Sequence, residues 1–139
     1  MRRIPRKVEI EDNAGNVTRY VRHDNGEGYV SPYAHVHPDA TVEAGAYVEA
    51  GARVEARARV GRFSWIDEDA VVGAEAKVDR DVHLGVRGVV GDRARIGHNA
   101  RLGGDIRVEP DAVVLPDQIV PEGTVVRCSR RRRDFGTAA

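Results

Sequence analysis

An aliphatic residue stands at every sixth position of this chain from Val36 to Val126, and this unbroken period strongly limits the possible folds. The series is Val36, Val42, Val48, Val54, Val60, Ile66, Val72, Val78, Leu84, Val90, Ile96, Leu102, Val108, Val114, Val120 and Val126. A second series, mostly of small residues, precedes the first by two positions and runs from Ala34 to Thr124. An α-helix repeats every 3.6 residues or so and an alternating strand every two, so neither keeps both series in phase at a spacing of six. A short strand followed by a corner does, which predicts an all-β solenoid.

Each six-residue unit supplies two inward side chains and one corner. Positions two apart in a strand face the same side, so the small and the aliphatic residue both point inward. The second corner position carries Gly, Asn or Asp, which tolerate left-handed backbone, at residues Asp39, Gly45, Gly51, Asp69, Asp81, Asn99, Asp105, Asp111, Asp117 and Gly123. Three units close a triangular coil, and the whole series makes about five coils of stacked parallel strands, on the order of 25 Å tall.

The repeat resembles that of the hexapeptide-repeat family. The stretch Val90–Gly97 matches its motif, an aliphatic residue, a glycine or acidic residue, two variable positions and a small residue. The resemblance covers residues 34–127 and implies a single-stranded left-handed parallel β-helix. It also implies a homotrimer, because members of the family are commonly trimeric.

The N-terminal residues depart from the repeat. Lys7–Glu11 and Val17–Val21 alternate in polarity around the turn-rich segment Asp12–Asn16, which predicts a β-hairpin. A solenoid exposes open strand edges at its ends, so residues 1–33 are expected to form an N-terminal cap. The alternative interpretation is that the hairpin docks a protein partner.

The C-terminal end also departs from the repeat. Val120–Val126 resembles the closing segment of hexapeptide-repeat acyltransferases, and the β-helix is expected to end at residue 127. Residues 128–139, which include Arg130 to Arg133, are expected to form a basic, disordered tail. Docking of an anionic partner by these arginines is the alternative.

Composition limits the function classes. Lys plus Arg total 22 and Asp plus Glu total 22, a balance that argues against general attraction to nucleic acid or membranes. The single cysteine, Cys128, leaves no internal disulfide and suits a reducing compartment. The start lacks the apolar run of a signal peptide, and no stretch reaches transmembrane length. The protein is therefore expected to be soluble and cytoplasmic, or part of an assembled particle.

Residues 18 apart should stack, which sorts the outward positions into three walls. The first wall shows Tyr47, Trp65, His83, Arg101 and Ile119, the second Arg59, Lys77 and Arg95, and the third Arg53, Val71, Val89 and Arg107. The charged column of the second wall is interpreted as ordinary solvent cover. Contiguous exposed apolar area tends to mark an interface, so Val71 and Val89, or Tyr47 and Trp65, are the predicted subunit contact.

The stretch Ile96–Gly104 is the place where the sequence suggests catalysis. Hexapeptide-repeat acyltransferases use a histidine as general base at a groove between subunits, and His98 begins a corner here. The resemblance therefore implies a catalytic role for His98. The residues that would bind an anionic carrier or substrate are Arg62, Arg80, Arg101 and His83.

Other activities fit less well. The same stretch resembles γ-class carbonic anhydrases, but Gly103 replaces their second histidine and no third zinc ligand is evident, so no metal site is predicted. The coils also lack the inserted loop that builds the acceptor pocket in acyltransferases of the family. The leading hypothesis is a non-catalytic, trimeric structural or assembly protein without a cofactor. The alternative is a small acyltransferase that uses acetyl-CoA or another acyl-CoA, with His98 as general base.

Overall fold

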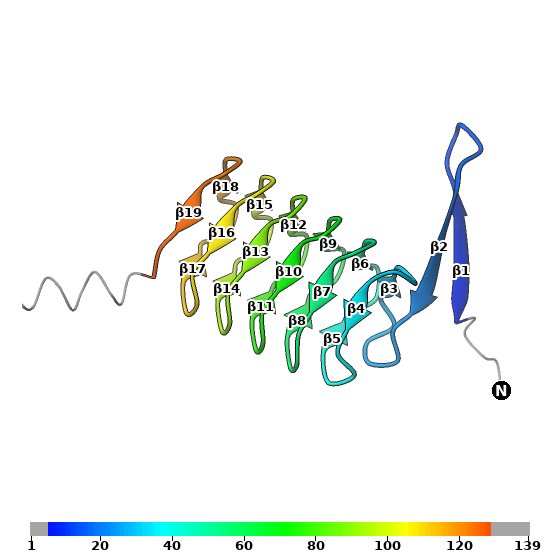
Figure 1. Cartoon of the computed structure of the whole chain (residues 1–139), viewed down its shortest axis with the longest axis horizontal. Helices are drawn as coiled ribbons and strands as arrows, with labels where there is room; N and C mark the ends of the chain where they lie inside the picture. The colour runs from blue at the N-terminus through cyan, green and yellow to red at the C-terminus, as the bar shows by residue number, and fades with distance from the viewer. Residues whose placement is uncertain (1–5, 129–139) are drawn as a thin grey trace, which may run out of the picture.

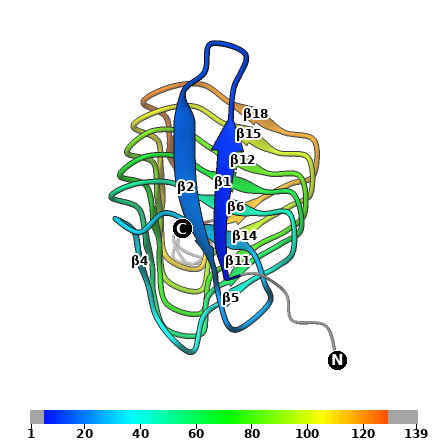
Figure 2. The same cartoon turned by 90° about the vertical axis from the view of Figure 1, so that its right-hand side faces the viewer.

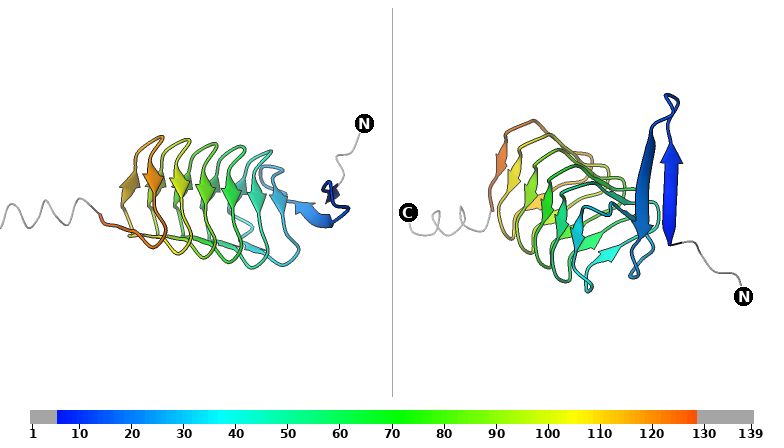
Figure 3. Two further views of the ribbon diagram at one scale, coloured as in Figure 1. Left: turned by 90° about the horizontal axis from the view of Figure 1, so that it is seen from above. Right: turned by 45° about the vertical axis from the view of Figure 1, so that its right-hand side comes forward.

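The computed structural model describes residues 6–128, and the predicted tail with Arg130 to Arg133 lies outside that range. Within it the chain is all β, without a helix. Five coils stack into a three-walled prism with a hairpin at one end (Figures 1 and 3). Viewed from the hairpin end, the chain passes from β4 through β5 to β6 anticlockwise as it recedes (Figure 2), so the β-helix is left-handed, as predicted.

Each wall is a sheet of two-residue parallel strands. The first wall contains β3 (Tyr29–Val30), β6 (Tyr47–Val48), β9 (Trp65–Ile66), β12 (His83–Leu84), β15 (Arg101–Leu102) and β18 (Ile119–Val120). The second contains β5 (Thr41–Val42), β8 (Arg59–Val60), β11 (Lys77–Val78), β14 (Arg95–Ile96) and β17 (Val113–Val114). The third contains β4 (His35–Val36), β7 (Arg53–Val54), β10 (Val71–Val72), β13 (Val89–Val90), β16 (Arg107–Val108) and β19 (Val125–Val126).

The core consists of the two inward series. From Val42 to Val120 every aliphatic residue of the six-residue period is buried, and most of the small residues two positions earlier are buried with them. Ser64 is the polar member of the small series. Its hydroxyl donates to the carbonyl oxygen of Asp79 and accepts from the backbone N–H of Val82, so its burial leaves no unpaired group.

From Gly45 onward the corners impose a left-handed backbone on their second residue, whereas Asp39, predicted at the same position of the first corner, does not adopt it. Non-glycine residues with φ between 56° and 65° are Arg57, Phe63, Asp69, Glu75, Asp81, Arg87, Arg93, Asn99, Asp105, Asp111 and Asp117. Asn and Asp accept this conformation readily, whereas Arg, Phe and Glu adopt it at a cost. Stacking of the coils therefore overrides the local preference at the less favourable corners.

The predicted hairpin is confirmed. β1 (Lys7–Glu11) and β2 (Val17–Arg22) pair in antiparallel fashion, and β2 continues the first wall through β3. The parallel pairing thus starts at Tyr29, one unit before the predicted start of the β-helix at residue 34. Gly28 allows this start, because a Cβ there would lie 2.3 Å from Cγ1 of Val42.

Tyr20 fixes the hairpin to the prism. Its side chain is buried, and its ring packs edge-on against Tyr47 at 5.2 Å between centroids. The Tyr20 hydroxyl donates to Glu49 at 3.0 Å, and burial together with the Glu49 charge raises the pKa of Tyr20, so the hydroxyl remains a donor. Tyr47, which the sequence placed on an open column, is therefore covered by the chain's own hairpin.

Candidate functional site

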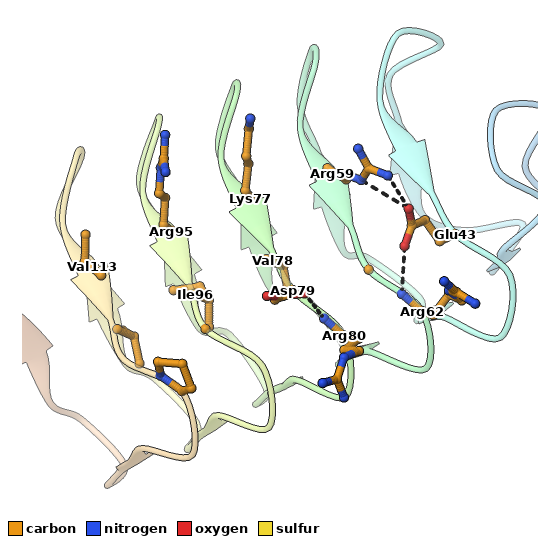
Figure 4. Close-up of a pocket in the computed structure, with 14 residues that line it drawn as sticks. Glu43, Arg59, Arg62, Lys77, Val78, Asp79, Arg80, Arg95, Ile96 and Val113 are labelled. Carbon is orange, nitrogen blue, oxygen red and sulfur yellow. Dashed lines mark hydrogen bonds and ion pairs between the residues drawn. The ribbon is translucent and has the colours of Figure 1, made fainter.

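A hollow of about 520 Å³ lies over the second wall and the corner that leads to the first wall (Figure 4). Five cationic side chains line it: Arg59, Lys77 and Arg95 on the wall, and Arg62 and Arg80 at the corner. Its acidic lining residues are Glu43 and Asp79, so five cations against two carboxylates leave an excess of three positive charges. We call this feature the basic hollow.

The cations on the wall oppose one another. Lys77 pairs in register with Arg59 on one neighbouring strand and with Arg95 on the other, an arrangement that destabilises a sheet unless the charges are compensated. Arg59 has compensation, because its Nε lies 3.1 Å from Oε2 of Glu43. Within residues 6–128, Lys77 and Arg95 have no ion-pair partner. An anionic ligand would supply the missing charge.

Elsewhere the prism pairs its charges between coils. Three ion pairs join corner residues 18 apart: Arg57 with Glu75 at 2.9 Å, Arg87 with Asp105 at 2.8 Å, and Arg93 with Asp111 at 3.0 Å. Lys77 and Arg95 thus lack the pairing between coils that these three corner arginines have. Sequence reasoning missed them, because it treated the second wall as solvent cover.

His98 lies at the corner beside the basic hollow, in the same column as Arg62 and Arg80. Its chain neighbour Gly97 lines the hollow. Nδ1 of His98 is buried and is the one such side-chain N or O atom in residues 6–128 without a hydrogen-bond partner, while the residue as a whole is half-buried. A buried polar atom without a partner costs free energy, so its presence calls for a functional or structural reason.

His83 has a different environment on the first wall. Its Nε2 lies 3.2 Å from Oδ2 of Asp67, and its ring stacks on Trp65 with 4.4 Å between centroids. A carboxylate that orients a histidine is the geometry of a general base, so His83 has the orienting group that His98 lacks. Arg101 follows His83 on the wall and donates from Nη1 to the carbonyl oxygen of Asp81 at 3.0 Å. Of the four predicted substrate-binding residues, Arg62 and Arg80 therefore lie at the corner of the basic hollow, whereas His83 and Arg101 lie on the first wall.

A second hollow, which the sequence did not indicate, lies between the hairpin and the first wall. Its volume is about 510 Å³, and it is lined by Val17, Thr18, Arg19, Tyr20, Ser31, Pro32, Tyr33, Glu49, Ala50, Trp65, Asp67 and Glu68. Burial raises the pKa of Glu49, against the opposing effect of the hydrogen bond from Tyr20. We call this feature the acidic cleft, because three carboxylates face one arginine in its lining.

The predicted interface residues are spread over two walls. Val71 and Val89 are neighbours in register on the third wall and are half-buried, and Trp65 is exposed on the first wall. Tyr47 is covered by the hairpin, as described above. Of the four predicted interface residues, Val71 and Val89 are thus the pair that are neighbours on one wall, and their role in a subunit contact stays a prediction.

The sequence period and the coil geometry agree throughout the prism. Residues 18 apart are neighbours in register on all three walls, as shown by Trp65 with His83, Lys77 with Arg95 and Val71 with Val89. The chain is a hexapeptide-repeat left-handed β-helix. No family model matches its sequence, and no curated protein does.

Solved structures of several acetyltransferases resemble this hexapeptide-repeat chain. A mutant of perosamine N-acetyltransferase from Caulobacter crescentus, solved with CoA and GDP-perosamine, is 24% identical over 70% of this chain and 51% of its own, with a TM-score of 0.38. The acetyltransferase domain of PglB from Neisseria gonorrhoeae is 26% identical over 71% of this chain and 53% of its own, with a TM-score of 0.44. Serine acetyltransferase isoform 3 from Entamoeba histolytica is 16% identical over 62% of this chain and 33% of its own, with a TM-score of 0.45. The chain thus spans about half of the first two proteins.

Two further properties concern residues 6–128 of the hexapeptide-repeat chain. That range contains no helix long and apolar enough to cross a membrane. It also contains no group of three or more His, Cys, Asp or Glu side chains placed to hold a metal ion.

Proposed function

We propose that this protein is a small acyl-CoA-dependent acyltransferase with His98 as general base. The observation that carries the proposal is the basic hollow beside His98, where cations without partners face an open volume. CoA carries several phosphate charges, and a volume of about 520 Å³ lies within the range of ligand sites, roughly 300–1,000 Å³. Lys77, Arg95 and Arg62 would hold the phosphates through charge-assisted hydrogen bonds.

The chemistry asked of His98 is proton transfer. An acceptor hydroxyl or amine must lose its proton as it attacks the thioester carbonyl, and the imidazole of the half-buried His98 would take this proton. When the C–S bond of the thioester breaks, the CoA thiolate leaves and receives this proton from the His98 imidazolium, so the transfer is balanced and the base is regenerated. His83, held by Asp67, is the second histidine with base geometry, and a comparison of the two residues tests the assignment.

Calorimetric titration with acetyl-CoA tests the proposal. Saturable binding near one ligand per chain is expected, and its loss in a Lys77→Glu, Arg95→Glu variant would place the ligand in the basic hollow. His98→Ala should abolish acyl transfer and leave acetyl-CoA binding and the fold intact. His83→Ala is the matched histidine control, and it should retain acyl transfer. Absence of heat at several temperatures, or unchanged turnover in His98→Ala, would contradict the proposal.

A second candidate function is a non-catalytic, trimeric assembly protein, favoured by the uninterrupted coils and the Val71–Val89 pair. Val71 and Val89 are neighbours in register, so a second subunit could cover both together. Mass measurement by light scattering should give three chains per particle, and Val89→Glu should dissociate it. A monodisperse monomer at micromolar concentration would rule out this assembly.

A further inference from the structure

The acidic cleft is a built concave site. One side comes from β2 of the hairpin and the other from the parallel strands of the first wall, so two parts of one sheet converge on it. Tyr20 reaches across from β2 and donates to Glu49, which fixes one side of the cleft against the other. Concave sites with aromatic walls and a few convergent polar groups are the usual form of a binding site.

The charge of the cleft is negative. Its lining contains the carboxylates of Glu49, Asp67 and Glu68, against the single cation Arg19. Arg19 is directed to another partner, because its Nε lies 2.8 Å from Glu9. Within residues 6–128 the Glu68 carboxylate has no ion pair or hydrogen-bond partner, so it is available to a ligand.

Aromatic faces stand next to these carboxylates. Tyr33 is 76% exposed and Trp65 is 44% exposed at the cleft, where one face of the Trp65 ring is covered by His83. A guanidinium group stacks on an aromatic face and at the same time donates paired hydrogen bonds to a carboxylate. The lining therefore suits arginine better than lysine, whose ammonium is a compact point charge.

The same chain contains the complementary segment. Four consecutive arginines, Arg130 to Arg133, follow Cys128, and the whole chain is neutral with 22 basic and 22 acidic residues. The hairpin and β19 lie at opposite ends of the prism (Figure 1). The acidic cleft at one end and the arginines that follow the other end in sequence therefore suit contact between two copies arranged end to end.

We propose that the acidic cleft binds Arg130–Arg133 of a second copy of this chain and so joins copies end to end. The contact is heterologous, because the tail of one copy meets the cleft of the next. It is independent of the proposed acyl transfer, since the basic hollow lies over the second wall and its corner.

Trp65 gives a direct measurement, because it is the single tryptophan of the chain and lines the cleft. The receptor is the full chain with all four arginines changed to glutamine, and the probe is a synthetic peptide of residues 127–139. Saturable change of Trp65 fluorescence is expected, with affinity that falls as salt rises. Glu49→Gln with Glu68→Gln in the receptor should weaken binding about tenfold. Absence of a saturable change would overturn the proposal.

Glu122→Gln is the matched control, because Glu122 occupies the same corner column as Glu68 at the other end of the prism. It should leave peptide affinity unchanged, and equal weakening would mean non-specific attraction and overturn the assignment to the cleft. Sedimentation of the native chain should show salt-sensitive association that the four-glutamine variant lacks. If Trp65 emission already differs between these two proteins as monomers, the contact forms within one chain and the end-to-end proposal is wrong.

Discussion

The basic hollow and the acidic cleft have nearly the same volume, about 520 and 510 Å³, but opposite charge and different construction. The basic hollow is made by repeat positions alone, over β8, β11 and β14. The acidic cleft exists only where the hairpin lies against the first wall. The repeat therefore restricts the residue types at the inward positions but not at the outward ones, so one scaffold can carry opposite charges on adjoining walls.

The two sites also depend on different contacts for their stability. Beneath the basic hollow, Val78, Ile96 and Val114 are buried in the continuous core. The acidic cleft depends on Tyr20, whose ring and hydroxyl hold the hairpin. Since each coil contacts mainly its neighbours, damage at one end should leave the other site in place.

Tyr20→Ala is expected to have the largest effect, because it should disrupt the acidic cleft and leave the basic hollow intact. Loss of a buried aromatic side chain costs about 3 kcal/mol or more, and here the loss falls on the hairpin. Hydrogen exchange should show loss of protection in Lys7–Arg22, together with loss of peptide binding at the acidic cleft. Binding of acetyl-CoA should persist. Tyr33→Ala, at an exposed position on the same cleft, should leave hairpin protection unchanged; loss of protection throughout the coils in Tyr20→Ala would contradict a local role.

Lys77→Glu should have the next largest effect, on the basic hollow alone. It places a carboxylate between Arg59 and Arg95, which relieves the repulsion and removes the attraction for an anion. We expect acetyl-CoA binding to weaken about tenfold and thermal stability to be maintained or raised. Calorimetry measures the first effect and thermal unfolding the second. Equal weakening by Arg93→Glu, on a neighbouring corner, would show that overall charge governs the affinity.

Glu49→Gln should have a smaller effect that depends on pH. The pKa of Glu49 is raised in the folded chain, so its contribution to stability is present at low pH and is lost as pH rises through the folded-state pKa. Glutamine cannot ionise and still accepts the Tyr20 hydrogen bond. The variant should therefore unfold at a higher temperature than the native chain at pH 7, with the difference disappearing toward pH 4. A lower unfolding temperature at pH 7 would show that the charged form of Glu49 is stabilising.

Arg93→Gln should have the smallest effect. The pair of Arg93 with Asp111 is largely exposed, with 54% and 33% of the side chains accessible, and such pairs contribute little to stability because solvent screens them. Thermal unfolding should change by a degree or so at low salt and not at all at high salt. A larger change would mean that the ion pairs between coils act as a network.

The period of six was sufficient to predict the walls and the columns, because every inward position obeys one rule. The left hand of the coil came instead from the resemblance to the hexapeptide-repeat family, since the spacing alone does not determine it. The acidic cleft could not be predicted, since it depends on how Tyr20 docks against Tyr47, which lies 27 residues away and outside the hairpin. The basic hollow was misinterpreted for another reason. The sequence shows the column of like charges, but only the structure shows that Glu43 compensates Arg59 and leaves Lys77 and Arg95 without a partner.

The coil of 18 residues sets a rule for how this chain can change in length. Removal of one whole coil, such as residues 67–84, would shorten the prism and leave each remaining outer column on its own wall. Removal of a single six-residue unit would preserve the core equally well but rotate everything downstream by one wall. A six-residue deletion between Lys77 and Arg95, for example, would place Arg95 on a different wall from Arg59 and Lys77. Evolution of such a chain can therefore keep the fold through either deletion, but it keeps the surface sites only in steps of a full coil.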